Sequence, residues 1–166
     1  LKNAFDETAC MQLFGVKGCN YTAGSLEDIT AIQTPFGKTS LLVCADAYTY
    51  DTSALDKVKA LASEFLLIPW GVAAAQSNDC GQENFNATEY AAAAAKYLSG
   101  PYVAGTNAVG TRPYGRFRPS LYCGNSGYTA PDGTILGEAA SITAGIIYYD
   151  IPVSTPITAA INNSLK

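Results

Sequence analysis

The sequence predicts an α/β fold, in which short strand-like runs alternate with segments of helical periodicity. Two apolar runs, "TSLLVC" (39–44) and "FLLIPW" (65–70), are typical of buried strands, and each precedes a segment with apolar residues at helical spacing. The chain has 166 residues, of which 48% are apolar and 14% charged. It is therefore long enough for a single domain, 1–166, with a hydrophobic core.

The first half of this pattern is a strand, a helix and a second strand. Pro and Gly in "TPFG" mark a turn before the strand at 39–44. The segment "TSALDKVKALASEF" (52–65) predicts a helix with Ser53 as its N-cap and Asp56 three residues on. Its apolar positions recur at helical spacing: Ala54, Leu55, Val58, Leu61, Ala62 and Phe65. The strand at 65–70 follows.

The second half begins with another helix, predicted over "TEYAAAAAKYLSG" (88–100). Thr88 is its expected cap, Glu89 lies in its first turn, Lys96 in its last, and Gly100 just beyond it. The segment "PYVAGTNAVG" (101–110) predicts a strand that runs into a glycine-rich loop.

Three further segments complete the pattern. "GYTAPDGTIL" (127–136) predicts a hairpin around Pro131-Asp132-Gly133, and "AGIIYYDIP" (144–152) predicts a final strand. The basic stretch "TRPYGRFRPS" (111–120) holds two prolines, which favour a surface loop. It carries Arg112, Arg116 and Arg118, but the net charge of −4 argues against a nucleic-acid partner.

Several kinds of site are excluded by composition. There is no histidine, so a Ser-His-Asp site, a Cys-His site or a histidine-bearing zinc site cannot be built from this chain alone. No C-x-x-C pair occurs and no apolar run reaches the length of a transmembrane helix. We expect no metal and no cofactor. A catalytic base must come from a lysine, a carboxylate or another chain.

The cysteines and glycosylation sequons point to an oxidising compartment. Four of the five cysteines lie in loop-like sequence and are expected to form disulfides: Cys10, Cys19, Cys80 and Cys123. Three N-x-[ST] sequons are candidate glycosylation sites: Asn20, Asn86 and Asn162. The chain begins at Leu1, so we expect a processed or truncated piece of a secreted or extracellular protein. The alternative is that all five cysteines are reduced and structural.

Cys44 is the cysteine left over, and it ends a strand-like run. In α/β sheets, sites form where the carboxyl ends of strands turn into helices. The N-terminus of the helix that follows is expected to stabilise a thiolate there, and a thiolate is a strong nucleophile. Two alternatives remain: Cys44 is a small buried core residue, or it is itself disulfide-bonded in a stapled domain of unrelated function.

The segment "TPFGKTSLLVCADAYTYD" (34–51) resembles the nucleophile segment of the carbon–nitrogen hydrolase (nitrilase) superfamily. That family has a Phe-Gly turn, an apolar strand, the nucleophilic Cys, any residue, and Asp. Four later segments resemble the family in order: "SEFLLIPWG", "YAAAAAKYLSGPYVAGTNAVG", "GNSGYTAPDGTIL" and "AGIIYYDIP". Among its branches, the vanin and biotinidase branch of secreted amidases is the most similar. The resemblance implies half of a nitrilase-like α-β-β-α sandwich.

The resemblance also implies a Glu–Lys–Cys triad. Cys44 would be the nucleophile, the Ala45 N–H an oxyanion donor, and Trp70 part of the substrate pocket. Lys2 matches the family's lysine in "LKNAFDE", although its distance from Cys44 along the chain is longer than usual in the family. Lys17 and Lys38 are poorer matches. The glutamate belongs to the family's amino-terminal half, so its source would be that half of the same precursor or a partner chain.

Two functions follow as expectations. The first is a secreted amidase that hydrolyses a C–N bond of a small amide through a cysteine thioester, and that assembles into homo-oligomers. The segment "YTYD" (48–51) stands where the family often has Phe-Pro-Glu, which leaves the substrate open. The second is a non-catalytic extracellular structural or binding protein with the same fold, which oligomerises.

Overall fold

The computed structural model describes residues 24–71, 73–74, 80, 86–114, 117–140 and 142–152. The strands in these ranges are β1 (Ala31–Thr34), β2 (Gly37–Leu41), β3 (Phe65–Trp70), β4 (Ala73–Ala74), β5 (Tyr102–Asn107), β6 (Val109–Tyr114), β7 (Phe117–Cys123), β8 (Gly127–Thr129) and β9 (Ile135–Glu138). The helices are the 3₁₀ turns η1 (Leu26–Asp28) and η2 (Cys44–Ala47), and the α-helices α2 (Ser53–Ala60) and α3 (Ala87–Leu98). This mixed α/β architecture confirms the predicted class.

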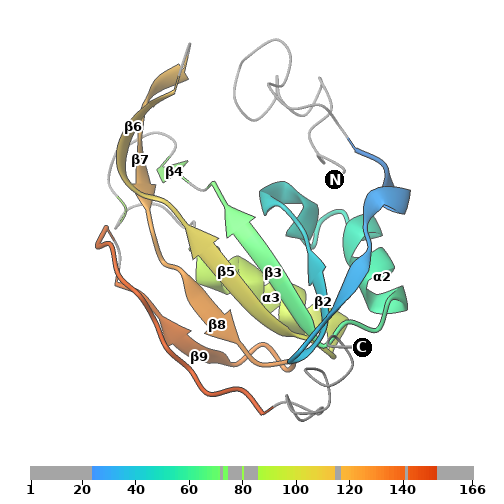
Figure 1. Ribbon diagram of the computed structural model, residues 1–166. Helices are drawn as coiled ribbons and strands as arrows, with labels where there is room; N and C mark the ends of the chain where they lie inside the picture. The colour runs from blue at the N-terminus through green and yellow to red at the C-terminus, as the bar shows by residue number, and fades with distance from the viewer. Residues whose placement is uncertain are drawn as a thin grey trace, which may run out of the picture.

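The main sheet has six strands in the order β1-β2-β3-β5-β8-β9. Its centre, β2-β3-β5, is parallel because α2 and α3 provide the crossover connections between successive strands (Figure 1). β1 and the predicted hairpin β8–β9 pair antiparallel at the two sides. A second sheet, β4-β7-β6, contains the long hairpin that extends away from the main sheet in Figure 1.

Both α-helices pack on the same face of the main sheet. Strand β3 shows why: Leu66 and Ile68 are buried against the helices, whereas Leu67, between them, points to the other face and is 41% exposed. The alanines of α3 allow close approach to the sheet. Among the described residues, the buried members of the core are Ile29, Leu42, Ala45, Ala47, Tyr48, Ala54, Leu55, Val58, Leu66, Ile68, Trp70, Ala87, Ala91, Ala94, Ala95, Leu98 and Val103.

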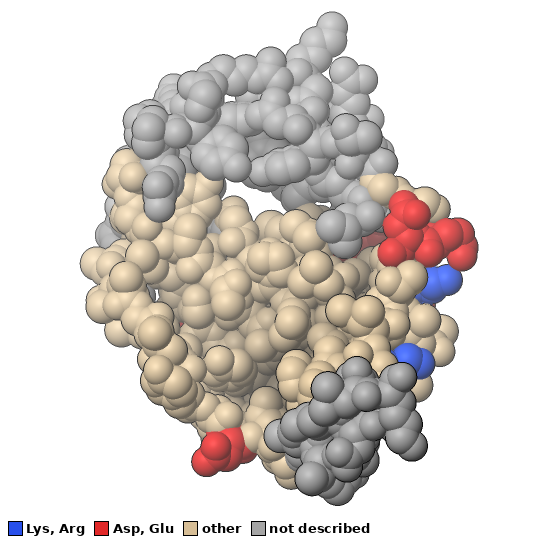
Figure 2. Space-filling view, in the orientation of Figure 1, with Lys and Arg blue, Asp and Glu red and all other residues tan. Residues whose placement is uncertain are grey.

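The opposite face of the sheet is uncovered by helices within the described part of the chain. Figure 1 views this face, with α3 behind the strands. Ile32, Leu41 and Leu67 are 67%, 46% and 41% exposed on it. In the same view, the described residues in Figure 2 carry charged side chains at the right margin and the lower left, with an uncharged area between them. This face is therefore an apolar surface with no layer over it among the described residues.

The helix ends differ from the prediction by one or two residues. Thr52, not Ser53, precedes the first residue of α2, and the Ser53 N–H donates to Asp51 Oδ1 at 3.0 Å. The helix ends before 65 because Ala62 adopts a left-handed backbone, φ +51°. Asn86, not Thr88, caps α3: its side-chain oxygen accepts hydrogen bonds from the backbone N–H groups of the next turn.

The prediction of a surface loop over 111–120 was wrong, because most of this stretch forms the β6–β7 hairpin. Pro113 falls in a register shift between Arg112 and Tyr114, where no regular ladder bond is interrupted. The predicted strand at 144–152 was also wrong. Its alternation of apolar residues is strand-like, but the segment has no strand partner among the described residues. The Tyr128 hydroxyl donates to its Ile147 carbonyl at 3.2 Å.

Candidate active site

Three elements of the parallel sheet end at the same edge. The Leu42 N–H still bonds the Leu67 carbonyl at 3.1 Å, and Cys44 starts the turn η2 two residues later. Trp70, the last residue of β3, is paired in register with Asn107, the last residue of β5. Cys44, Trp70 and Asn107 therefore meet at the carboxyl edge, where sites form in α/β folds.

Cys44 has an unusual backbone for a residue with a side chain. Its φ is +50°, in the left-handed region that L-residues seldom adopt. Asp46 holds the turn by reaching back, so that the Val43 N–H donates to its Oδ2 at 3.4 Å. Asp46 is 4% exposed. The Cys-x-Asp motif is therefore a sharp turn that presents a half-buried, free thiol at the strand end.

The electrostatics of the thiol correct one expectation. Burial raises the pKa of the Cys44 thiol, and the backbone N–H groups of Gly71 and Ala45, together with the Asp46 charge, modify that shift. The two N–H groups lower the pKa and Asp46 raises it, but the net direction is upward. The prediction that the N-terminus of the following helix stabilises a Cys44 thiolate was therefore wrong. Helix α2 starts only at Ser53, nine residues after Cys44. The thiol needs a base.

Ala45 and Gly71 supply the donors nearest the sulfur. The sequence motif predicts Ala45 as a donor, and this residue is buried in η2. Gly71 carries no side-chain signal, and only the parallel pairing of β2 and β3 brings the first residue after β3 next to the Cys44 turn. Two N–H groups directed at one atom form a site that favours negative charge on that atom.

Cys44 packs against a cluster of aromatic side chains in the core. The Tyr48 ring stacks on Trp70, with centroids 5.8 Å apart, and lies 4.9 Å from the Tyr90 ring. Trp70 is 5% exposed, so its indole packs in the core at the strand end. Contact between Trp70 and a substrate stays a prediction.

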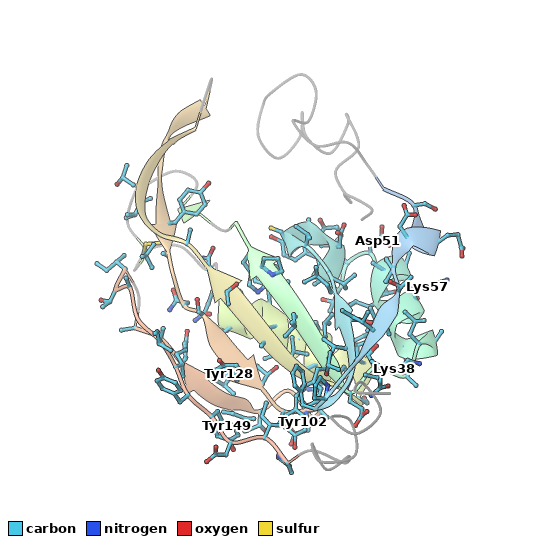
Figure 3. All side chains as sticks on the ribbon, viewed as in Figure 1. Lys38, Asp51, Lys57, Tyr102, Tyr128 and Tyr149 are labelled. Atoms are coloured by element: carbon cyan, nitrogen blue, oxygen red, sulfur yellow. A yellow bond between two sulfur atoms is a disulfide. The ribbon has the colours of Figure 1, made fainter. Side chains whose placement is uncertain are left out.

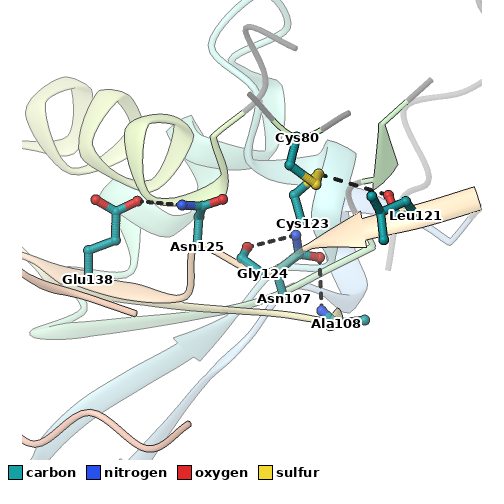
Figure 4. Close-up of a disulfide and its surroundings, with 8 residues drawn as sticks. All are labelled: Cys80, Asn107, Ala108, Leu121, Cys123, Gly124, Asn125 and Glu138. Carbon is teal, nitrogen blue, oxygen red and sulfur yellow. Dashed lines mark hydrogen bonds between the residues drawn. A yellow bond between two sulfur atoms is a disulfide. The ribbon is translucent and has the colours of Figure 1, made fainter. Parts of the chain in front are cut away.

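Two sequence motifs meet beside the end of β5. The Asn107 side chain donates to the Gly124 carbonyl at 2.9 Å, and the Asn107 N–H donates to Ser126 Oγ at 2.9 Å. The first of these bonds is drawn in Figure 4. The motifs Asn-x-x-Gly (107–110) and Gly-x-Ser (124–126) thus form one hydrogen-bonded corner. A cavity of about 250 Å³ adjoins this corner, lined by both motifs and by 143–145, and Cys44 is not among its lining residues.

A disulfide joins Cys80 to Cys123, with Cα atoms 5.5 Å apart (Figure 4). Cys123 is the last residue of β7, directly before Gly124, so the bond anchors Cys80 beside the Asn107 corner. Cys10 and Cys19 lie outside the described residues.

The remaining predicted residues are placed as follows. Lys2, Asn20 and Asn162 lie outside the described residues. Lys38 lies at the start of β2, far from the end that carries Cys44, as Figure 3 shows by comparison with Asp51. Asn86 is half-buried, and its side-chain Nδ2 donates to Glu138 Oε1 at 2.7 Å.

Among the described residues, no group of three His, Cys, Asp or Glu side chains could hold a metal ion. No helix in these ranges is both long and apolar enough to cross a membrane.

Solved structures of similar fold include an amidase from Nesterenkonia sp. and a carbon–nitrogen hydrolase from Helicobacter pylori G27. The amidase gives a TM-score of 0.61 at 20% identity, over 88% of this chain and 50% of its own. The hydrolase gives 0.60 at 21% identity, over 72% of this chain and 42% of its own. This chain has a nitrilase-like fold.

The similarity extends to a larger enzyme and to a chemically labelled one. Glutamine-dependent NAD+ synthetase from Acinetobacter baumannii gives a TM-score of 0.56 at 15% identity, over 86% of this chain and 23% of its own. One structure of the Nesterenkonia amidase carries the acetamide moiety of fluoroacetamide on its active-site cysteine. This nitrilase-like chain spans half or less of these proteins. No family model and no curated protein matches its sequence.

Proposed function

We propose that the chain is part of a secreted thiol amidohydrolase, of the vanin and biotinidase type, that hydrolyses a C–N bond of a small amide. The observation that carries this proposal is the Cys44 turn. It combines a free thiol, a left-handed backbone at the carboxyl end of a parallel strand, and two N–H groups directed at the sulfur. Nucleophile turns need this arrangement because it exposes the attacking atom beside donors for the oxyanion.

The reaction proceeds in two steps. A carboxylate takes the Cys44 proton, and the sulfur attacks the amide carbon to form a tetrahedral intermediate. The intermediate's oxyanion is stabilised by the Ala45 N–H and by a lysine, for which Lys2 is the candidate. The C–N bond breaks, the amine leaves with the proton, and the acyl group stays on sulfur as a thioester. Water, deprotonated by the same carboxylate, then releases the acid.

The raised pKa keeps the Cys44 thiol protonated near neutral pH, so the site needs a base, and we assign that base to a carboxylate of a second unit. The apolar sheet face supports such a partner. A second layer over Ile32, Leu41 and Leu67 would bury surface that now faces water, and the chain spans half of the amidase that it resembles in fold. We infer that the partner is the family's glutamate-bearing half, in the same precursor or in another chain, and that the completed units form homo-oligomers.

Secretion and glycosylation are also proposed. The Cys80–Cys123 bond favours an oxidising compartment, in which disulfides persist. The sequons at Asn20, Asn86 and Asn162 belong to the same compartment.

Labelling and turnover together test the proposal. The intact protein, with whatever chain accompanies it, is treated with fluoroacetamide and digested, and Cys44 is expected to carry an acetamide adduct. Amide hydrolysis should fall by about 10³-fold or more in Cys44→Ser. Intact mass under reducing conditions then identifies a partner chain. If Cys44 is unlabelled while other thiols react, or if hydrolysis survives in Cys44→Ser, the proposal is wrong.

The second candidate is a non-catalytic extracellular protein that uses the same fold for assembly. The raised pKa of Cys44 favours it, because a protonated thiol without a base is a poor nucleophile. A partner chain that lacks the glutamate, in a complex without amidase activity, would favour this candidate.

A further inference from the structure

Four aromatic rings lie next to Cys44, and three of them pack against one another. Tyr48 contacts both Trp70 and Tyr90, and these last two lie 6.2 Å apart between ring centroids. The fourth ring, Tyr50, lies 5.3 Å from Tyr48 at a tilt of 44°. The cluster therefore continues outward from the core to Tyr50.

Exposure separates Tyr50 from the others. Tyr48 is 8% exposed and Trp70 is 5%, whereas Tyr50 is 66% exposed. Core packing explains the buried rings but not a large, mostly exposed ring at the outer edge of the same cluster. A tyrosine held on one side by another ring is a rigid, flat contact surface, and it loses little conformational entropy when a ligand packs against it.

Tyr50 is also close to the reacting sulfur. Burial, Asp51 and Cys44 all raise the pKa of its hydroxyl, in that order, and Cys44 likewise contributes to the raised pKa of Tyr48. Cys44 also packs against the buried cluster that contains Tyr48, the ring beside Tyr50. Because Tyr50 follows Cys44 by six residues and its ring lies against the same cluster, a group bonded to the sulfur lies near the exposed ring.

The charges nearby limit which groups fit. Asp46 lies two residues after Cys44 and Asp51 directly follows Tyr50, so the segment that carries the thiol and the ring also carries two carboxylates. A substrate whose acyl part carried its own carboxylate would be repelled by them. An uncharged acyl group with a flat, apolar body has no such cost and gains contact with the ring.

We propose that Tyr50 is a specificity-determining residue whose ring forms one wall of the acyl-binding part of the Cys44 site, favouring amides with an uncharged aromatic acyl group. This inference deepens the proposed amidase function and rests on it for the identity of the bound group. It concerns the ring of Tyr50, not its hydroxyl.

The test measures selectivity through alkylation of Cys44, which needs no turnover. Rate constants for 2-bromo-2-phenylacetamide and 2-bromoacetamide are determined by peptide mapping of Cys44 in the intact protein. Their ratio cancels changes in thiol pKa, because both reagents attack the same sulfur. We expect the rate constant for 2-bromo-2-phenylacetamide, divided by that for 2-bromoacetamide, to fall about fivefold in Tyr50→Ala. In Tyr50→Phe this ratio should stay within about twofold of the wild-type value. Tyr148→Ala, which removes a ring that is 84% exposed, serves as the control.

Two results would overturn the proposal: an unchanged ratio in a folded Tyr50→Ala, or an equal loss in Tyr50→Phe, which would assign the effect to the hydroxyl. Hydrolysis of phenylacetamide and acetamide is measured in parallel. If the alkylation ratio depends on Tyr50 while neither amide is hydrolysed, the proposed amidase function fails and the role of Tyr50 stands. If both amides are hydrolysed but neither the alkylation ratio nor the hydrolysis ratio depends on Tyr50, the amidase function stands and the proposed role of Tyr50 fails.

Discussion

The backbone N–H of Gly71, just past the end of β3, acts on the Cys44 thiol beyond the end of the neighbouring parallel strand β2 and lowers its pKa. It offsets part of the burial that raises the pKa of the thiol. Gly71 has no side chain to reveal this role, and open space surrounds its Cα, with no atom within 4 Å of an added Cβ. Backbone and side-chain effects can therefore be separated at this residue.

Gly71→Pro removes the N–H and should raise the pKa of Cys44 further, because the thiolate loses a donor. Gly71→Ala keeps the N–H and should leave the pKa unchanged. The measurement is the pH dependence of Cys44 alkylation by iodoacetamide. Equal pH profiles for the two variants would contradict the hydrogen bond.

The raised pKa of Cys44 also predicts a pH dependence of stability. The folded protein holds the thiol proton more tightly than the unfolded chain does. Proton binding at Cys44 therefore stabilises the folded state below the pKa of the unfolded chain, about 8.5. That effect is lost as the pH rises through the higher folded pKa. The free energy of unfolding should therefore fall more steeply above pH 8.5 in the wild-type protein than in Cys44→Ser. Urea titrations at pH 7 to 10 measure it.

Burial, the largest cause of the raised pKa of Tyr48, is present in both proteins of that comparison, so only the smaller contribution of Cys44 to that pKa differs between them. Parallel stability curves across the alkaline range would mean that the thiol has the same pKa in the folded and unfolded states.

The sequence predicted the parts of the fold that depend on local chemistry. The strand at 65–70 has the predicted bounds, and the Pro131-Asp132-Gly133 turn joins β8 to β9. Hydrophobic period and turn residues determine both. The resemblance to the nitrilase superfamily extended the prediction to the nitrilase-like fold, whereas the role that it implies for Cys44 stays a prediction.

The failures have a common cause, which is pairing between distant segments. The alternation of 144–152 fits a strand, but a strand needs a partner ladder, and the described residues provide none. The prolines of 111–120 suggested a loop, yet a register shift accommodates Pro113. The raised pKa of Cys44 depends on burial by residues far along the chain. Single-segment patterns contain no information on these contacts.

Gly105 makes room for the Trp70 indole, which belongs to the aromatic cluster next to Cys44. An added Cβ would lie 2.5 Å from Nε1 of Trp70, whose indole is buried. Gly105→Ala should displace the indole, destabilise the fold by about 1–3 kcal/mol and shift the fluorescence of the single tryptophan. Gly100→Ala is the control, because its nearest neighbour would be 3.8 Å away. Unchanged emission in Gly105→Ala would contradict this packing.

The Cys80–Cys123 bond closes a loop of 43 residues that contains α3 and β5. In the loop-entropy account, a cross-link of this span stabilises the folded state by about 4 kcal/mol. Replacing both cysteines by serine should lower the free energy of unfolding by about 2–5 kcal/mol, measured by urea titration. Cys44→Ser at pH 7 is the control, since this cysteine is free. A loss no larger than the control's would show that the bond adds nothing to stability.

Leu66 and Leu67 are neighbours in β3 that point to opposite faces of the sheet, at 0% and 41% exposure. Leu66→Ala should cost about 2–5 kcal/mol in any assembly state, because it opens a cavity under the helices. Leu67→Ala should cost less than about 1 kcal/mol in the chain alone, since its side chain already contacts water. If a second layer covers this face, Leu67→Ser should instead weaken its association with the partner unit.

Urea titration measures the first two effects, and size-exclusion chromatography with light scattering measures the third. The matched pair separates the two faces because the residues share a strand and a side-chain type. An equal loss of stability from both alanine variants in the isolated chain would mean that Leu67 is buried within that chain. Unchanged association in Leu67→Ser, with Leu66→Ala still destabilising, would place the partner elsewhere and leave the apolar face open in the assembled protein.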